Sequence, residues 1–203
     1  MNFPSKVLEK AVEEISSLPG IGKKSALRLA LHLLRVPESQ GMALGKAIQK
    51  LVTDIKYCQE CHNFSDEDIC EICSNHKRND EVLCIVEDVR DVMAIENTAK
   101  FNGKYLVLGG KISPMEGIGS HQLNISSIER KLNEGKVKEL IFALSATMEG
   151  DTTAYYLYKK FKEFPVTFST IARGISVGDE LEYADEISLG RSIVNRLPYN
   201  EKM

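Results

Sequence analysis

The chain of 203 residues lacks any long apolar run. A helix that crosses a bilayer needs about 20 consecutive apolar residues, and no stretch approaches that length. The opening residues, Met1–Lys6, also lack the apolar core of a secretion signal. We therefore expect a cytoplasmic protein, in which 43% hydrophobic residues supply a core and 27% charged residues supply a solvated surface.

The sequence also lacks a strong excess of either charge, because its net charge is −3 at pH 7. This balance argues against a uniformly basic nucleic-acid-binding protein, but it allows one basic patch. A nucleotide-binding phosphate loop is missing as well. Gly41–Lys46 resembles one, but the spacing between its glycines is one residue short, and Ala47 stands where Ser or Thr would bind Mg²⁺. We therefore exclude ATP hydrolysis of the Walker type.

Cysteine is scarce, but four of the five cysteines occur in two Cys-x-x-Cys pairs. Two intervening residues let both thiolates of a pair aim at one point, so two pairs can form a tetrahedral shell around Zn²⁺. Two tandem disulfides are the less favoured alternative in a reducing cell. Four thiolates leave no open coordination position, which predicts one structural zinc ion per chain. The predicted ligands are Cys58, Cys61, Cys70 and Cys73.

The other residues near these cysteines have simpler interpretations. His62 could replace a cysteine as a ligand, but four well-spaced thiols make this unnecessary. The carboxylates Asp66–Asp68 are expected to be a solvated loop. The fifth cysteine, Cys84, lies in the apolar run 82–86 and is expected to be a small core residue.

Two predicted helices, over 7–15 and 23–34, flank the turn Ser17–Gly22. Pro19 presets one backbone angle in this turn, and the two glycines allow positive φ. Helix, Leu-Pro-Gly-Ile-Gly, helix resembles the helix-hairpin-helix DNA-binding motif. The glycines let backbone amides approach a phosphate at the positive end of the second helix, and nearby cations can neutralise phosphates. The expected DNA-binding residues are Gly20, Gly22, Lys23, Lys24 and Arg28. An ordinary helical hairpin with a lysine-rich solvated face remains the alternative.

A third amphipathic helix is predicted from Met42 to Lys56. Its apolar positions are expected to face inward, and they are Leu44, Ala47, Ile48, Leu51, Val52 and Ile55. After the cysteines, strand-like runs at 82–86, 105–108, 139–144 and 166–169 alternate with helical patterns at 88–99, 126–133 and 152–161. Such strand–helix repeats predict a parallel sheet that is covered on both faces. A short final helix is expected in the tail.

Acidic residues follow two of these predicted strands. Glu87 comes directly after the first, and Glu149 and Asp151 come after the third, in the segment 145–153. Ligands of parallel sheets gather at the carboxyl ends of strands. This arrangement resembles the Toprim fold, in which such acids hold Mg²⁺ for phosphoryl chemistry. No activated tyrosine accompanies them, since Tyr155–Tyr158 lie on a predicted helix where packing accounts for their aromatic rings.

The order of these motifs resembles the RecR family of bacterial recombination mediators over nearly the full length. The matching segments are 18–28, the four cysteines, 86–88, 148–151 and 174–178. Ser145 and Lys23 depart from that family, where Asn and Pro respectively are common. The resemblance implies a homotetrameric ring that encircles double-stranded and gapped DNA. It also implies RecO- and RecF-like partners that load recombinase at single-strand gaps, with no catalytic turnover.

The sequence thus predicts an α+β multi-domain protein. The expected parts are a helix-hairpin-helix domain (1–56), a Cys₄ zinc finger (57–78), an α/β Toprim domain with a parallel sheet (79–175) and a C-terminal oligomerisation tail (176–203). We expect a non-enzymatic DNA-binding clamp and adaptor for recombinational repair. Its acidic rim of Glu87, Glu149 and Asp151 would dock partners, although a solvated loop is the simpler alternative. Mg²⁺ could bind there but is not expected to be catalytic. The competing hypotheses are a Mg²⁺-dependent Toprim nuclease or primase-like enzyme and a protein-binding zinc scaffold.

Overall fold

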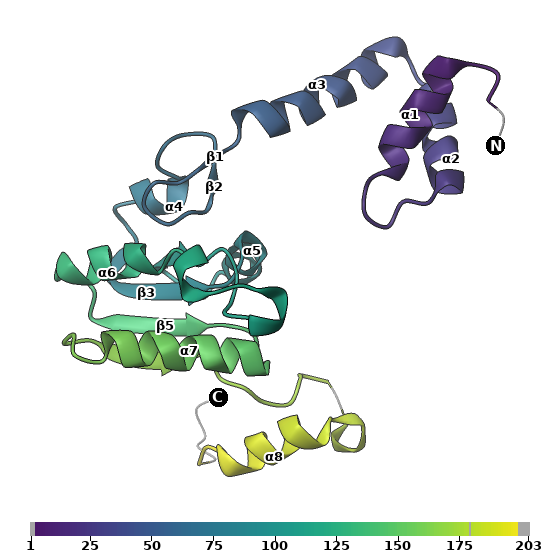
Figure 1. Ribbon diagram of the computed structural model, residues 1–203. Coiled ribbons are helices and arrows are strands. Elements are labelled where there is room, and N and C mark those ends of the chain that lie inside the picture. The colour runs from purple at the N-terminus through teal and green to yellow at the C-terminus, as the bar shows by residue number, and fades with distance from the viewer. Residues whose placement is uncertain (1–2, 179, 199–203) are drawn as a thin grey trace. The chain divides into compact units, whose positions relative to one another are not determined.

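The computed structural model describes residues 3–178 and 180–198. It divides into two compact units, Met1–Ile55 and Lys56–Met203, and each is described by itself (Figure 1).

The first unit contains α1 (Lys6–Ser16), α2 (Lys23–Leu33) and α3 (Glu38–Asp54). Helix α1 begins where the Ser5 hydroxyl accepts a hydrogen bond from the Leu8 amide. Helices α1 and α2 pack together around Val12, Ala26 and Ala30. The small alanines let the two helices approach closely, so the short hairpin has a core of its own.

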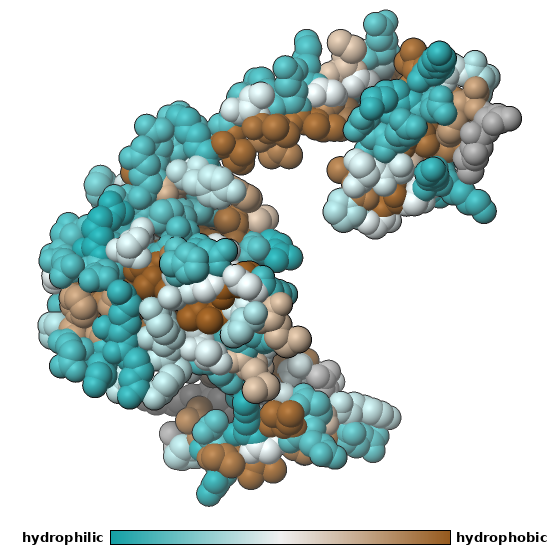
Figure 2. Space-filling view, in the orientation of Figure 1, coloured by the Kyte–Doolittle hydropathy of each residue, from teal (hydrophilic) through white to brown (hydrophobic). Residues whose placement is uncertain are grey.

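Helix α3 differs from its predicted role. It begins at Glu38, four residues before the predicted start, and none of its residues is buried. Leu51 is 61% exposed and Val52 is 76% exposed. Figure 2 shows the hydrophobic residues of α3 gathered along one side of the helix. The amphipathic pattern was interpreted correctly as a helix, but the expectation that its apolar face points inward was wrong, because no described part of the first unit covers that face.

The second unit begins with a small antiparallel hairpin of β1 (Lys56–Tyr57) and β2 (Phe64–Ser65), followed by the short helix α4 (Glu71–Ser74). A four-stranded parallel sheet comes next, in the order β4-β3-β5-β6. Its strands are β3 (Asn79–Val86), β4 (Gly103–Val107), β5 (Glu139–Ala143) and β6 (Thr167–Thr170). The helices are α5 (Val89–Asn97), α6 (Ile125–Asn133), α7 (Met148–Phe161) and α8 (Glu186–Val194). Three 3₁₀ turns lie at Pro114–Glu116, Ser120–Gln122 and Leu181–Tyr183.

The sheet is covered on both faces, as the alternating pattern predicted. Leu83 and Ile85 of β3 point to one face, where they join residues of α6 and α7 in the larger core. Cys84 and Val86 point to the other face and pack with Val92 of α5. Successive side chains of a strand point to opposite faces, which explains how one buried strand serves two cores. No helix in the described ranges is long and apolar enough to cross a membrane.

Helix α7 begins at Met148, earlier than predicted. Its first turn is capped by Thr147, whose hydroxyl accepts a hydrogen bond from the Gly150 amide at 3.2 Å. Gly150 is required there, because an added Cβ would lie 2.1 Å from the Ser145 carbonyl oxygen. Glu149 and Asp151 therefore lie in the first turn of a helix, and the loop predicted to carry them is shorter than expected.

Candidate metal centre, acidic edge and nucleic-acid surface

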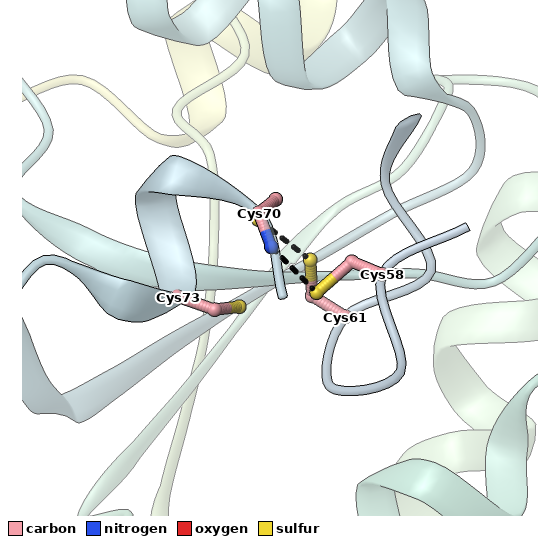
Figure 3. A group of neighbouring side chains, drawn as sticks. All are labelled: Cys58, Cys61, Cys70 and Cys73. Carbon is pink, nitrogen blue, oxygen red and sulfur yellow. Dashed lines mark hydrogen bonds between the residues drawn. The ribbon is translucent and has the colours of Figure 1, made fainter. Parts of the chain in front are cut away.

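The four cysteines of the two Cys-x-x-Cys pairs come together in one cluster (Figure 3). Their sulfur atoms all lie within 4.8 Å of one another. The Cys61 and Cys70 sulfurs are 3.5 Å apart, and the Cys70 amide donates to the Cys58 sulfur at 3.3 Å. A tetrahedron with metal–sulfur distances of about 2.3 Å requires sulfurs about 3.8 Å apart, so this cluster has the size of a tetrahedral zinc site. All five cysteines of the chain are free thiols.

Local backbone structure positions each cysteine pair. In the first pair the Cys58 amide donates a hydrogen bond to the Asn63 carbonyl at 2.8 Å. The His62 amide donates one to the Cys58 carbonyl at 2.9 Å. His62 adopts a φ of 62°, which turns the chain sharply after the pair. In the second pair Cys70 caps the N-terminus of α4, so that Cys73 follows on the same turn. Each pair therefore points both sulfurs at one place.

The four cysteines can all be thiolates only if a cation lies among them. Contact with the Cys61 thiol holds the pKa of Cys70 well below its usual range, and the same contact raises the pKa of Cys61. Sulfurs this close cannot all ionise beside one another unless a positive charge compensates them. Four soft thiolates in a tetrahedral arrangement are the donors that Zn²⁺ prefers. The residues therefore fit a structural zinc ion.

The neighbouring candidates have other roles. His62 is not part of the metal-ligand cluster, and its Nε2 atom lies 2.7 Å from the Ser127 hydroxyl of α6. Cys84 is 2% exposed in the core, and burial raises its pKa to about 12. A thiol with that pKa stays protonated at neutral pH, which agrees with the expected core role.

The three acidic residues lie toward the carboxyl edge of the sheet, where each has a partner within the chain. Glu87 follows β3, and its Oε1 atom accepts a hydrogen bond from the Ser145 amide at 2.6 Å. The Asp151 carboxylate forms ion pairs with two guanidinium groups. Its Oδ1 atom is 2.6 Å from Nη2 of Arg173, and its Oδ2 atom is 3.7 Å from Nη2 of Arg191 in α8. The Arg173 guanidinium holds the pKa of Asp151 below its ordinary value.

Glu149 is stabilised in its charged form by the first turn of α7. Its own backbone amide, then the Thr147 hydroxyl and Lys111, lower its pKa. The Lys111 ammonium is 3.3 Å from the Thr147 hydroxyl and 3.5 Å from the Ser145 hydroxyl. Among the described residues, the cysteine cluster is the only group of three or more His, Cys, Asp or Glu side chains that could share a metal ion. The three carboxylates therefore do not gather around one point.

Sequence reasoning missed the two arginines that hold Asp151. Arg173 lies three residues after β6, so its position just beyond a strand of the same sheet was the available signal. Arg191 lies on α8, and nothing local in the sequence connects it with Asp151.

The predicted DNA-binding residues lie on the exposed side of the helical hairpin. Gly20 adopts a φ of +79°, a backbone angle that residues other than glycine rarely adopt. Gly22 is the N-cap residue of α2 and has no side chain to accept a hydrogen bond from the first amides of the helix. The first amides of α2 are therefore left for another acceptor. Lys23, Lys24 and Arg28 are all exposed.

One face of α2 carries a shallow groove of about 360 Å³. Three cationic side chains line it together with two leucines and one histidine: Lys24, Arg28, Arg35, Leu27, Leu31 and His32. Arg35 was not among the predicted contacts. It lies two residues beyond Leu33, the last residue of α2, where it lines the groove together with Arg28.

Protein-family models match each of the four parts of the chain. Family models match residues 8–52 (RecR, helix-hairpin-helix), 55–75 (RecR, Cys₄-zinc finger domain), 81–172 (Toprim domain) and 174–196 (RecR, C-terminal). The recombination protein RecR of Flavobacterium johnsoniae is 61% identical over 201 residues, covering 99% of this chain and 98% of that protein.

The chain belongs to the RecR family.

The recombination protein RecR of Flavobacterium psychrophilum is 59% identical over 98% of this chain and 97% of its own length. That of Bacteroides thetaiotaomicron is 57% identical over 96% of this chain and 95% of its own length. The resemblance stated from the sequence is thereby confirmed, as is the order of helical hairpin, Cys₄ zinc finger, Toprim domain and C-terminal part.

Proposed function

We propose that this protein is a non-enzymatic DNA-binding clamp and adaptor of recombinational DNA repair in the cytoplasm. The observation that carries the proposal is the match to recombination proteins RecR over almost the whole chain. In this role, RecO- and RecF-like partners and the clamp together load recombinase at single-strand gaps. The cysteine cluster holds one structural zinc ion per chain, with Cys58, Cys61, Cys70 and Cys73 as its ligands.

DNA contact is assigned to the helical hairpin. Gly20 and Gly22 allow the amides at the start of α2 to meet a phosphate, while Lys23, Lys24 and Arg28 neutralise its neighbours. These contacts carry no sequence information, so binding should depend on salt more than on base sequence. The basic groove along α2 supports this assignment.

The test replaces Lys24 and Arg28 together by Ala. Each lost phosphate contact should flatten the slope of log affinity against log salt by about 0.9. The matched control is Lys159→Ala with Lys162→Ala, which changes the net charge equally on an exposed part of the second unit. Fluorescence anisotropy with two unrelated duplexes should show equal weakening on both. An unchanged affinity and slope in the hairpin variant would remove this surface from the DNA site.

Assembly into a homotetrameric ring accounts for two exposed apolar faces. Helix α3 exposes the face described above, and Ile187 and Val194 of α8 are 69% and 76% exposed. Exposed apolar faces of this extent are typical of protein–protein contacts. Light scattering should give the mass of four chains, and a ring should be retained longer on closed circular DNA than on linear DNA.

The acidic rim of Glu87, Glu149 and Asp151 is assigned to partner docking. The pairing of these acids with groups of the chain itself argues against a shared Mg²⁺ ion and therefore against phosphoryl chemistry. The test incubates nicked, single-stranded and supercoiled DNA with wild type and Glu149→Ala in Mg²⁺ or Mn²⁺. No turnover by either protein is expected, with binding of a RecO-like partner lost only in the variant. Cleavage, relaxation or primer synthesis that disappears in Glu149→Ala would instead establish a Toprim enzyme.

A further inference from the structure

Residues of strand β4 donate hydrogen bonds to one backbone carbonyl group of each cysteine pair. The Val107 amide donates to the Cys61 carbonyl at 2.8 Å, and the Lys104 ammonium donates to the Cys73 carbonyl at 2.8 Å. Because β4 is an edge strand, no other strand within residues 3–178 and 180–198 pairs with its outer hydrogen-bonding groups. The zinc finger thus covers the open edge of the sheet, and a single strand contacts both halves of the metal site.

Lys104 is held firmly in this position. Its side chain is only 18% exposed, and its ammonium also pairs with Asp80 at 2.9 Å. The side chain borders a narrow cavity of about 200 Å³ that Cys73 and Leu83 also line. An ammonium on a side chain that is mostly buried needs acceptors, and among the described residues the Cys73 carbonyl and the Asp80 carboxylate accept from it.

The two cysteine pairs differ in how they are attached to the sheet domain. The first pair has several contacts besides Val107, including His62 with Ser127 and Glu60 with Lys131 at 2.8 Å. The second pair has the Lys104 bond and the apolar packing of Ile72. Cys73 is also the least buried of the four cysteines. Among the residues that the structure describes, the polar attachment of the second pair to the sheet therefore depends on the Lys104 side chain.

We propose that Lys104 is a positioning residue for the zinc centre. It fixes the Cys70–Cys73 pair against β4 and places a positive charge beside a site whose four thiolates outweigh the charge of the metal. Groups behind the direct ligands typically change metal affinity by about 10- to 100-fold when they are removed. The inference rests on the zinc centre proposed above.

The test compares zinc release from wild type, Lys104→Met and Lys104→Arg, each as the full chain. Release into excess chelator is followed with a colour indicator, after the zinc content of each protein has been measured. Lys104→Met keeps the aliphatic stem but loses the charge and the hydrogen bonds, so it should release zinc at least about 10-fold faster. Lys104→Arg should restore most of the wild-type rate, and the thiolate-to-cobalt absorption of Co²⁺-loaded protein should change only in Lys104→Met.

The matched control is Lys138→Met, which removes an exposed lysine paired with Glu81 on the same sheet but touches no cysteine pair. It should release zinc at the wild-type rate. If Lys104→Met does not fold, Asp80→Asn, which loosens the ammonium while retaining Lys104, should still speed release. Wild-type release rates in whichever of these two variants folds would overturn the proposal. A wild-type protein that contains no zinc would overturn the zinc centre itself, and the initial metal measurement separates these results.

Discussion

The cysteine cluster and the acidic rim of Glu87, Glu149 and Asp151 are both groups of ionisable side chains that, from the sequence, could bind a cation. In the structure the four sulfurs lie within 4.8 Å of one another, whereas the three carboxylates do not share a point. The sulfurs contact each other, while Glu87 contacts a backbone amide and Asp151 contacts two arginines.

The difference shows what makes a metal site. The thiolates are unfavourable together without a cation, so the folded cluster creates a demand for zinc. Glu87 and Asp151 of the acidic rim instead contact donors and cations of the chain itself, and we therefore expect no resident metal ion there. Residue type and position at a strand end are therefore weaker indicators than convergence of the side chains.

The largest expected effect comes from breaking the cysteine cluster. Cys70→Ser should lose zinc and destabilise the zinc finger strongly, because a structural site can contribute on the order of 10 kcal/mol to the folding of the segment that binds it. Zinc content and thermal unfolding would measure this. Cys84→Ala is the matched control, since it removes a buried thiol outside the cluster and should retain one zinc per chain. Normal cooperative melting of zinc-free Cys70→Ser would show that the cluster is not a folding determinant.

A smaller effect is expected at Glu87. Glu87→Ala leaves the Ser145 amide without its acceptor and should lower the free energy of unfolding by about 1–2 kcal/mol. Glu87→Gln keeps a carbonyl acceptor and should stay close to wild type. Urea unfolding with and without Mg²⁺ provides the measurement, and Mg²⁺ should change none of the three proteins. If Mg²⁺ stabilised only the wild-type protein, the acidic rim would be shown to bind a metal ion.

The smallest effect is expected at Asp151, whose side chain is 43% exposed and therefore screened by solvent. Asp151→Asn should lower the free energy of unfolding by less than about 1 kcal/mol at pH 7. Arg173 lowers the pKa of the folded carboxyl, so the ion pair stabilises the fold above the unfolded pKa of about 3.9 and is lost as the pH falls through the lower, folded value. The wild-type advantage should therefore be constant from pH 7 to about 5 and shrink below about 4. An advantage that grows on acidification would contradict this assignment.

Local patterns predicted much of the fold and the metal cluster. The alternating residues of β3 and the Cys-x-x-Cys spacing are short-range signals, because strand period and loop geometry are set within a few residues. The early start of α7 also had a local signal, namely Thr147 as a cap followed by acidic residues in the first turn.

The remaining features depend on contacts between distant segments. Asp151 is joined to Arg191 across 40 positions of sequence, and no local pattern connects them. Lys104 of β4 likewise contacts Cys73 of α4 across 31 positions of sequence, with no local pattern that connects them. The exposed apolar face of α3 looked like an inward face because periodicity shows that a stripe exists without showing what covers it.

The most direct test of this comparison is elemental analysis of the purified wild-type chain after equilibration with Mn²⁺ and gel filtration. We expect one zinc per chain and no retained manganese. Absence of zinc, or retention of one manganese per chain that Glu149→Ala abolishes, would contradict it.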